Sequence, residues 1–240
     1  MVQGAYFTDR GTREENEDSV LLQSESDRLA AVVADGLGGQ GGGQEASGIA
    51  VKTLCRFLPA GDIDEQLHAW FSEANEEILK RQEPGKKMMS TAVALYLEDD
   101  LAVWAHIGDS RLYHFFNGSL IMQTLDHSVS QMAVFRKEIT QEQIRFHEDR
   151  NRVLRALGGD EEAREETNNV RLTPGFHAFL LCSDGFWEYV LETEMEQTLS
   201  ASSTPEEWLV KMCNVLQQKE STEHDNFTAA AVFYTGEEKA

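Results

Sequence analysis

Several apolar stretches of this chain run straight into an aspartate, and this pattern constrains the fold more than any other. The length of each stretch suits a buried strand, and a following glycine allows the chain to turn there. Strands that end in this way direct their carboxylates into a shared crevice. Two junctions have this glycine, Ala34-Asp35-Gly36 and Ser183-Asp184-Gly185, and in the third, Gly108-Asp109-Ser110, the glycine precedes the aspartate.

Further acidic residues lie at the starts of strand-like segments. Glu17-Asp18 precedes residues 19–22, and Asp225 precedes residues 227–234. Carboxylates that converge repel one another, by on the order of 4 kcal/mol per pair at ~4 Å and an effective dielectric of 20. Divalent cations remove this cost, and ligands that are all oxygen favour Mg²⁺ or Mn²⁺ over Zn²⁺. The sequence therefore predicts a divalent-metal site.

The composition narrows the class of protein. The chain has 240 residues, 41% of them hydrophobic, which is enough for a sizeable core. Its formal net charge of −21 disfavours binding to nucleic acid or to an anionic membrane. Three scattered cysteines form no C-x-x-C motif, and we find neither a signal segment nor a membrane-spanning run. We expect a cytoplasmic protein and a monomer.

The hydrophobic periodicity predicts strands and helices in separate blocks. We see no linker, so residues 1–240 are predicted to form a single domain. Runs of strands joined by turns favour an α/β fold with a central antiparallel β-sandwich flanked by helices on both faces, giving four layers, α-β-β-α. Predicted strands cover 3–9, 18–23, 29–34, 90–97, 101–107, 111–116, 119–124, 167–172, 176–182 and 227–234, and predicted helices cover 43–58, 63–82, 127–135, 140–156 and 204–219.

The chain does not match other motifs that bind phosphate groups or cleave esters. Residues 36–41 read G-x-G-x-x-G, but Asp35 lies directly before the first glycine, where the pyrophosphate of a dinucleotide would bind. We interpret these glycines as a loop whose backbone approaches a metal or ligand closely. No cysteine has an arginine six positions later, so a cysteine-based phosphatase is excluded, and G-x-S-x-G is absent.

Arg13 lies four residues before Glu17 and has two interpretations. It forms a salt bridge with a carboxylate, or it binds a phosphoryl group through its bidentate guanidinium. An arginine beside a two-metal carboxylate site suits the hydrolysis of phosphate esters, in which the metals generate hydroxide near neutral pH.

At this point the chain resembles the metal-dependent serine/threonine protein phosphatases, the type 2C or PPM family, in their bacterial stand-alone branch. Eight motifs occur in the family's order and span nearly the whole chain. They are residues 11–18 (GTREENED), 33–39 (VADGLGG), 90–92 (STA), 108–111 (GDSR), 125–128 (LDHS), 151–158 (NRVLRALG), 183–185 (SDG) and 225–226 (DN).

The resemblance implies a role for each matching residue. Asp35 would bridge two Mn²⁺ or Mg²⁺ ions, and Asp184 and Asp225 would complete the coordination of the first. Glu17 and the Gly36 carbonyl would help to hold the second. The remaining matches concern water, phosphate and a third ion. Asp18 would orient a coordinated water, Arg13 would bind the phosphoryl group, and Asp109 would bind a third, weaker ion.

The chain departs from the family in two places. Animal relatives have a histidine after the Asp-Gly pair as a candidate general acid, but here Leu37 cannot donate a proton. The segment 129–150 corresponds to the family's flap, in which relatives often have a glycine near the position of Lys137-Glu138. Its absence predicts a stiffer and more helical start to the flap.

We therefore expect an enzyme that hydrolyses phosphoserine and phosphothreonine in proteins, with a metal-bridging hydroxide as nucleophile. The resemblance implies that it opposes a bacterial Ser/Thr kinase, with forkhead-associated proteins among its substrates. The alternative is a pseudophosphatase that binds a partner through the same surface. Asp109 also has an alternative, because 108–111 reads equally as an ordinary turn.

Overall fold

Two antiparallel sheets form the centre of the protein. The computed structural model describes residues 2–38, 42–58, 62–85, 87–219 and 223–236. The first sheet has the strand order β1 (Val2–Asp9), β11 (Phe227–Gly236), β10 (Gly175–Cys182), β7 (Arg111–Phe116), β8 (Ser119–Gln123). The second has the order β2 (Asp18–Glu25), β3 (Arg28–Leu37), β5 (Ala92–Glu98), β6 (Leu101–Ile107), β9 (Glu166–Arg171), with the short β4 (Met89–Ser90) beside β3.

The central strands are apolar throughout because both of their faces are buried. In β3, Leu29, Ala31 and Val33 belong to the core between the sheets, together with Phe179 and Leu181 of β10. The alternate residues of β3 face the opposite way and belong to the core beneath the helices. Successive side chains of a strand point to opposite faces, so an unbroken apolar run is what a strand between two cores requires.

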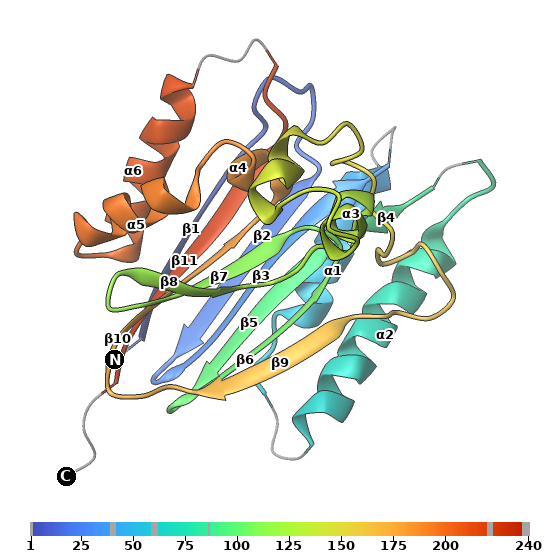
Figure 1. Ribbon diagram of the computed structural model, residues 1–240. Coiled ribbons are helices and arrows are strands. Elements are labelled where there is room, and N and C mark those ends of the chain that lie inside the picture. The colour runs from blue at the N-terminus through green and yellow to red at the C-terminus, as the bar shows by residue number, and fades with distance from the viewer. Residues whose placement is uncertain (1, 39–41, 59–61, 86, 220–222, 237–240) are drawn as a thin grey trace.

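Helices cover the outer face of each sheet (Figure 1). α1 (Gly42–Leu54) and α2 (Ile63–Arg81) pack on the second sheet. α5 (Glu192–Ser200), α6 (Pro205–Gln218) and the short α4 (Asp184–Trp187) pack on the first. The four-layer α-β-β-α architecture predicted from the sequence is thereby confirmed.

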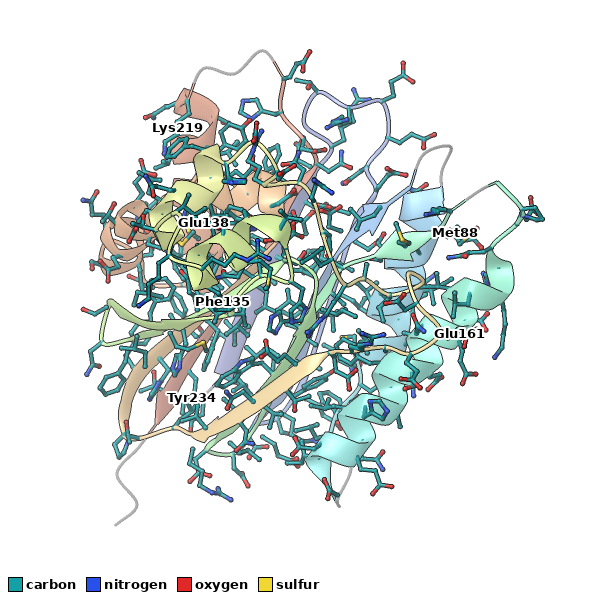
Figure 2. The ribbon with its side chains drawn as sticks, turned by 45° about the vertical axis from the view of Figure 1, so that its right-hand side comes forward. Met88, Phe135, Glu138, Glu161, Lys219 and Tyr234 are labelled. Carbon is teal, nitrogen blue, oxygen red and sulfur yellow. The ribbon has the colours of Figure 1, made fainter. Side chains whose placement is uncertain are left out.

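The flap segment differs in detail from its prediction. α3 (Val129–Phe135) forms as expected, but the helix predicted over 140–156 is wrong, because only the 3₁₀ helix η1 (Gln141–Phe146) forms there. The chain beyond it must pair with distant segments, as the isolated bridge between Val153 and Ser128 shows. Phe135 and Glu138 lie on either side of the turn that ends α3 (Figure 2).

The backbone conformation of Lys137 explains why the helix at the start of the flap is not extended as predicted. Its φ is +62°, in the left-handed region that a side chain disfavours by roughly 1–2 kcal/mol. The position thus keeps the backbone conformation typical of glycine although it carries a lysine. The absence of glycine has left the turn in place and has not extended the helix.

Two other local features depend on short segments. Asn117 and Gly118 both adopt positive φ between β7 and β8, as an Asn-Gly pair does in a tight hairpin turn. The helix α5 was not predicted, because its nine residues carry only two buried apolar side chains, Met195 and Leu199. Residues 39–41 of the glycine-rich loop lie outside the described residues. Within the described ranges, the helices are all too short or too polar to cross a membrane.

The core between the sheets gives a direct test of the fold. Leu181 is fully buried there. Leu181→Ala should lower the free energy of unfolding by about 2–5 kcal/mol, since it removes buried methyl groups and leaves a cavity. Val210→Ala, on the exposed face of α6, should change it by less than about 0.5 kcal/mol. Urea denaturation of both variants checks this, and equal effects would contradict the described core.

Candidate active site

The acidic residues singled out in the sequence meet at one end of the sandwich. All of them except Asp18 line a cavity of about 340 Å³, and Asp18 is the strand partner of the lining residue Asp35. Asp18 and Asp35 are directly opposite one another in the β2–β3 pair. Asp109 follows β6, Asp184 follows β10 and Asp225 precedes β11. The described residues that line the cavity are Arg13, Glu17, Asp35, Gly36, Leu37, Gly38, Asp109, Asn151, Val153, Asp184, Asp225 and Asn226.

The backbone of Asp35 is fixed by Ser90 and Thr91. The Asp35 N–H donates to Thr91 Oγ1 at 2.9 Å, and the Asp35 carbonyl accepts from Thr91 N at 2.8 Å and from Ser90 Oγ at 3.0 Å. These bonds fix the backbone of Asp35 near the end of β3, and Asp35 lines the cavity. This explains the local role of the Ser90-Thr91 motif.

Glu17 and Gly36 present two oxygens to the same place. The Gly36 N–H donates to the Glu17 carbonyl at 3.1 Å, which ties the start of β2 to the end of β3. The Gly43 N–H at the start of α1 donates to Glu17 Oε1 at 3.2 Å. A Cβ on Gly43 would lie 2.6 Å from the Gly36 carbonyl oxygen and 2.7 Å from Glu17 Oε1. Glycine at position 43 therefore keeps space open beside both oxygens.

Asp18 is held by the opposite sheet. Its Oδ2 accepts from Ser183 Oγ at 2.6 Å, and Ser183 Oγ in turn accepts from Thr228 N at 3.0 Å. Its Oδ1 is buried and has no hydrogen-bond partner among the described residues. Burial, with a smaller contribution from the nearby Asp184 and Asp225, raises the pKa of Asp18 to about 7. Such a carboxylate needs a cation or a proton.

Asp225 and Asn226 join the Arg13 loop to the site. Arg13 Nη2 donates to Asp225 Oδ2 at 2.8 Å, in an ion pair whose side chains are 61% and 39% exposed. Asn226 donates from Nδ2 to the carbonyls of Arg10 and Glu15, and its Oδ1 accepts from Glu17 N at 2.7 Å. Arg13 thus forms the salt bridge that was one of its two interpretations. This ion pair leaves most of the guanidinium donors available for a phosphoryl group.

Asp109 is buried, which distinguishes it from an exposed turn aspartate. It is only 2% exposed, and its Oδ1 has no hydrogen-bond partner in the described part of the chain. Burial raises its pKa well above the usual value, and repulsion from Asp184 raises it further. A turn aspartate accepts local hydrogen bonds and would not leave a buried oxygen unpaired.

The electrostatics of the cluster fit divalent cations. Burial is the largest cause that raises the pKa of Asp35, followed by repulsion from Asp184, Asp18 and Asp109. The pKa of Asp184 rises to about 6 through burial and Asp225. The donors are all oxygen atoms, and two of them are buried without a hydrogen-bond partner among the described residues. This is the donor set and the charge imbalance that Mg²⁺ or Mn²⁺ satisfies.

Glu188 and Arg150 lie beside the acidic residues and were not identified from the sequence. A second cavity, of about 510 Å³, shares Arg13, Asp184 and Asp225 with the first. Glu188 and Arg150 also line it, and Arg150 Nε donates to Glu188 Oε1 at 2.9 Å. Burial and then Asp184 raise the pKa of Glu188 to about 7. Its position four residues after Asp184 could have indicated from the sequence that Glu188 belongs to the site. Its partner Arg150 is distant in sequence, so the pair could not be recognised.

A second cluster of potential ligands consists of His106, His127 and Glu166. His127 Nδ1 accepts from Gly108 N at 3.1 Å, so its proton is on Nε2, which lies 3.4 Å from Glu166 Oε2. His106 Nε2 lies 2.9 Å from the Leu125 carbonyl, which can only accept, so this nitrogen is also protonated. The nitrogens nearest Glu166 thus have no free lone pair, and we interpret the cluster as structural.

Comparison with known proteins agrees with the geometry. The sequence model of the family described as Protein phosphatase 2C matches residues 8–227. The chain belongs to the protein phosphatase 2C family. It is 34% identical over 211 residues to the serine/threonine phosphatase stp of Listeria monocytogenes serotype 4b (strain F2365), covering 83% of each chain. The chain is thus a protein serine/threonine phosphatase of this family.

Solved structures show the same architecture. The serine/threonine phosphatase Stp1 from Staphylococcus aureus superposes with a TM-score of 0.87 at 26% identity, covering 98% of this chain and 96% of that one. The catalytic domain of the phosphatase PstP, in complex with two manganese ions, superposes with a TM-score of 0.81 at 28% identity, covering 96% and 97%. The α/β sandwich is therefore that of the family.

The raised pKa values predict how the metal-free phosphatase responds to pH. The pKa rises from 3.8 to about 6 at Asp184 and to about 7 at Asp18, so the folded state binds more protons than the unfolded chain between these values. The free energy of unfolding should therefore fall as pH rises from about 4 to about 7. Mn²⁺ should restore most stability at the upper end of this range.

Thermal denaturation in EDTA and in Mn²⁺ across this pH range measures the effect. Asp35→Asn removes one of the repelling charges and should flatten the metal-free curve. A metal-free stability that rises with pH would contradict the predicted repulsion, and so would a Mn²⁺ effect that is the same at both ends of the range.

Proposed function

We propose that this phosphatase hydrolyses phosphoserine and phosphothreonine in proteins by a two-metal mechanism. The observation that carries the proposal is the convergence of Asp35, Asp184, Asp225 and Glu17 on one cavity, with Arg13 at its edge. Phosphoryl transfer requires neutralisation of the phosphoryl oxygens and a nucleophile positioned in line with the leaving group. The described residues that line the two active-site cavities include no cysteine, which supports direct hydrolysis.

The described residues divide into two ligand groups around Asp35. Asp184 and Asp225 would hold one ion together with Asp35, while Glu17 and the Gly36 carbonyl would help to hold the other. Bound divalent cations lower the pKa of water and neutralise negative charge on the phosphoryl group. Mn²⁺ and Mg²⁺ are both suited to this oxygen-only site. Asp109 would serve a third, weaker ion.

The chain's own residues then position the substrate. Arg13 is exposed at the cavity edge, where its free guanidinium donors would bind two phosphoryl oxygens. Asp18 lies behind Asp35 and would accept a hydrogen bond from a water in the cavity, with its orientation fixed by Ser183. Leu37 lines the cavity but has no proton to donate, so protonation of the leaving oxygen falls to another group.

The resemblance to the family supports a wider proposal about the context of the function. We propose one catalytic domain over residues 1–240, with the flap at 129–150 beside the cleft, acting as a cytoplasmic monomer. Its substrates would be phosphoproteins produced by a Ser/Thr kinase, including forkhead-associated proteins. The adjoining cavity of about 510 Å³ is large enough to hold residues next to the phosphorylated one. We do not assign binding to nucleic acid or to membranes, which the net charge of −21 opposes.

The alternative is a pseudophosphatase that binds a partner without turnover. Loss of one ligand would be typical of such a protein, but Glu17, Asp35, Asp184 and Asp225 are all present and all line the cavity. The intact acidic set favours the enzyme.

Metal dependence is the test that separates these two functions. The purified protein should hydrolyse p-nitrophenyl phosphate and a phosphothreonine peptide in Mn²⁺, and it should lose this activity in EDTA because an oxygen-ligand site exchanges its metals readily. Steady-state assays with Asp35→Asn as the inactive control measure this. Full activity in metal-free buffer would contradict the two-metal proposal, and no activity in either condition would favour the pseudophosphatase.

Arg13 gives a second prediction. Its ion pair with Asp225 is exposed and worth at most about 1 kcal/mol, so Arg13→Ala should hardly change the melting temperature. It should raise KM for phosphopeptides, and Arg13→Lys should restore binding only in part, because lysine lacks the bidentate fork. Arg28→Ala, which breaks a comparably exposed pair with Glu25, is the matched control. An unchanged KM with a clearly lowered melting temperature would make Arg13 purely structural.

A further inference from the structure

The turn that carries Asp109 is held from three directions. The Gly108 N–H donates to His127 Nδ1 at 3.1 Å, and the Gly108 carbonyl accepts from His127 N at 2.8 Å. Ser110 Oγ lies 2.7 Å from Thr91 Oγ1, which also contacts the backbone of Asp35. The Asp109 carbonyl accepts a hydrogen bond from the indole Nε1–H of Trp187 at 2.9 Å.

Trp187 connects this turn to a second acidic residue. It is the last residue of α4, whose first residue is Asp184. Asp109 lies between β6 and β7, Asp184 follows β10, and both line the cavity of about 340 Å³. Two carboxylates that line one cavity repel each other. The Trp187 hydrogen bond joins the backbones that carry them.

The indole ring itself has little freedom to move. Trp187 is 1% exposed, and the guanidinium carbon of Arg111 lies 3.4 Å from the ring centroid. Arg111 is fixed in turn by two hydrogen bonds to Asp126, at 2.8 and 2.7 Å. A buried cation stacked on an indole and paired with a carboxylate gives the ring one orientation.

We propose that Trp187 is a positioning residue that holds the Asp109 carboxylate at a fixed distance from Asp184, so that a weakly bound cation can be shared near them. The inference rests on the proposed two-metal function and extends it to a residue outside the cavity lining. Without the indole N–H, the buried Asp109 carbonyl loses its partner and the repelling carboxylates can separate. The affinity of the weak site for its cation should fall, while the ions held by Asp35 should remain bound.

Trp187→Phe tests this inference because phenylalanine keeps an aromatic ring beneath Arg111 and removes the N–H donor. Trp208→Phe is the matched control. Trp208 is also fully buried and donates its Nε1–H to the backbone carbonyl of Met195 at 3.0 Å and to Thr198 Oγ1 at 3.1 Å, but it lies on α6 in the core beneath the first sheet. Both variants lose the indole N–H donor and comparable ring volume, so Trp208→Phe should lose at least as much stability as Trp187→Phe.

Calorimetric titration with Mn²⁺ provides the readout that a purely structural role would not change. In Trp187→Phe, the dissociation constant of the weak class of site should rise by about tenfold, which is what one buried hydrogen bond is worth. The tight class should be unchanged, and kcat should fall until Mn²⁺ is raised. Trp208→Phe should titrate like the wild type. Identical Mn²⁺ curves for the two variants would overturn the inference.

Two further points keep the test decisive. If Trp187→Phe fails to fold, benzothienylalanine at position 187 keeps the bicyclic shape and replaces only the N–H with sulfur. Failure of the proposed function is separately visible, because a wild-type protein that binds Mn²⁺ in two classes without hydrolysing phosphopeptides would contradict the enzyme and leave the Trp187 comparison intact.

Discussion

Repulsion among carboxylates at one end of the sandwich is the constraint on which the rest of the site depends. Asp18, Asp35, Asp109 and Asp184 all have raised pKa values because they are buried close to one another. A structure with so much negative charge in one place would spread apart unless the backbone held it. The two sheets hold the backbone in place, because their central strands end next to each other at this position.

The surrounding hydrogen bonds can be understood as responses to that repulsion. Thr91 holds the backbone of Asp35, Ser183 holds the carboxylate of Asp18, and Asn226 holds the loop that precedes Glu17. None of these residues is itself charged, so each fixes an acidic segment without neutralising it. The charge is left for metal ions, and the affinity of the site for cations depends on this uncharged framework.

Much of the site could be predicted from the sequence because its ligands follow local rules. Asp35 and Asp184 end apolar strands and precede glycine, which is a pattern of neighbours in the chain. Asp109 also follows an apolar strand, Glu17 and Asp225 precede strands, and the order of the eight motifs then implied a role for each. The sandwich followed from runs of strands separated from blocks of helices. These features depend on short segments, and the sequence displays them directly.

The features that were missed depend on partners far apart in the chain. The Ser183–Asp18 bond joins residues 165 positions apart, and the bond from Trp187 to Asp109 joins residues 78 apart. The helix predicted over 140–156 failed because pairing of Val153 with Ser128 overrides local periodicity. Lys137 keeps a glycine-like backbone although its residue type argues against it. Tertiary contacts decide these positions.

A crystal structure of the protein grown in Mn²⁺, with anomalous scattering recorded at the manganese edge, tests the central claim most directly. The account predicts two strong anomalous peaks that both contact Asp35, one beside Asp184 and Asp225 and the other beside Glu17 and the Gly36 carbonyl. Absence of manganese from this cavity, or manganese bound only between His106, His127 and Glu166, would contradict it.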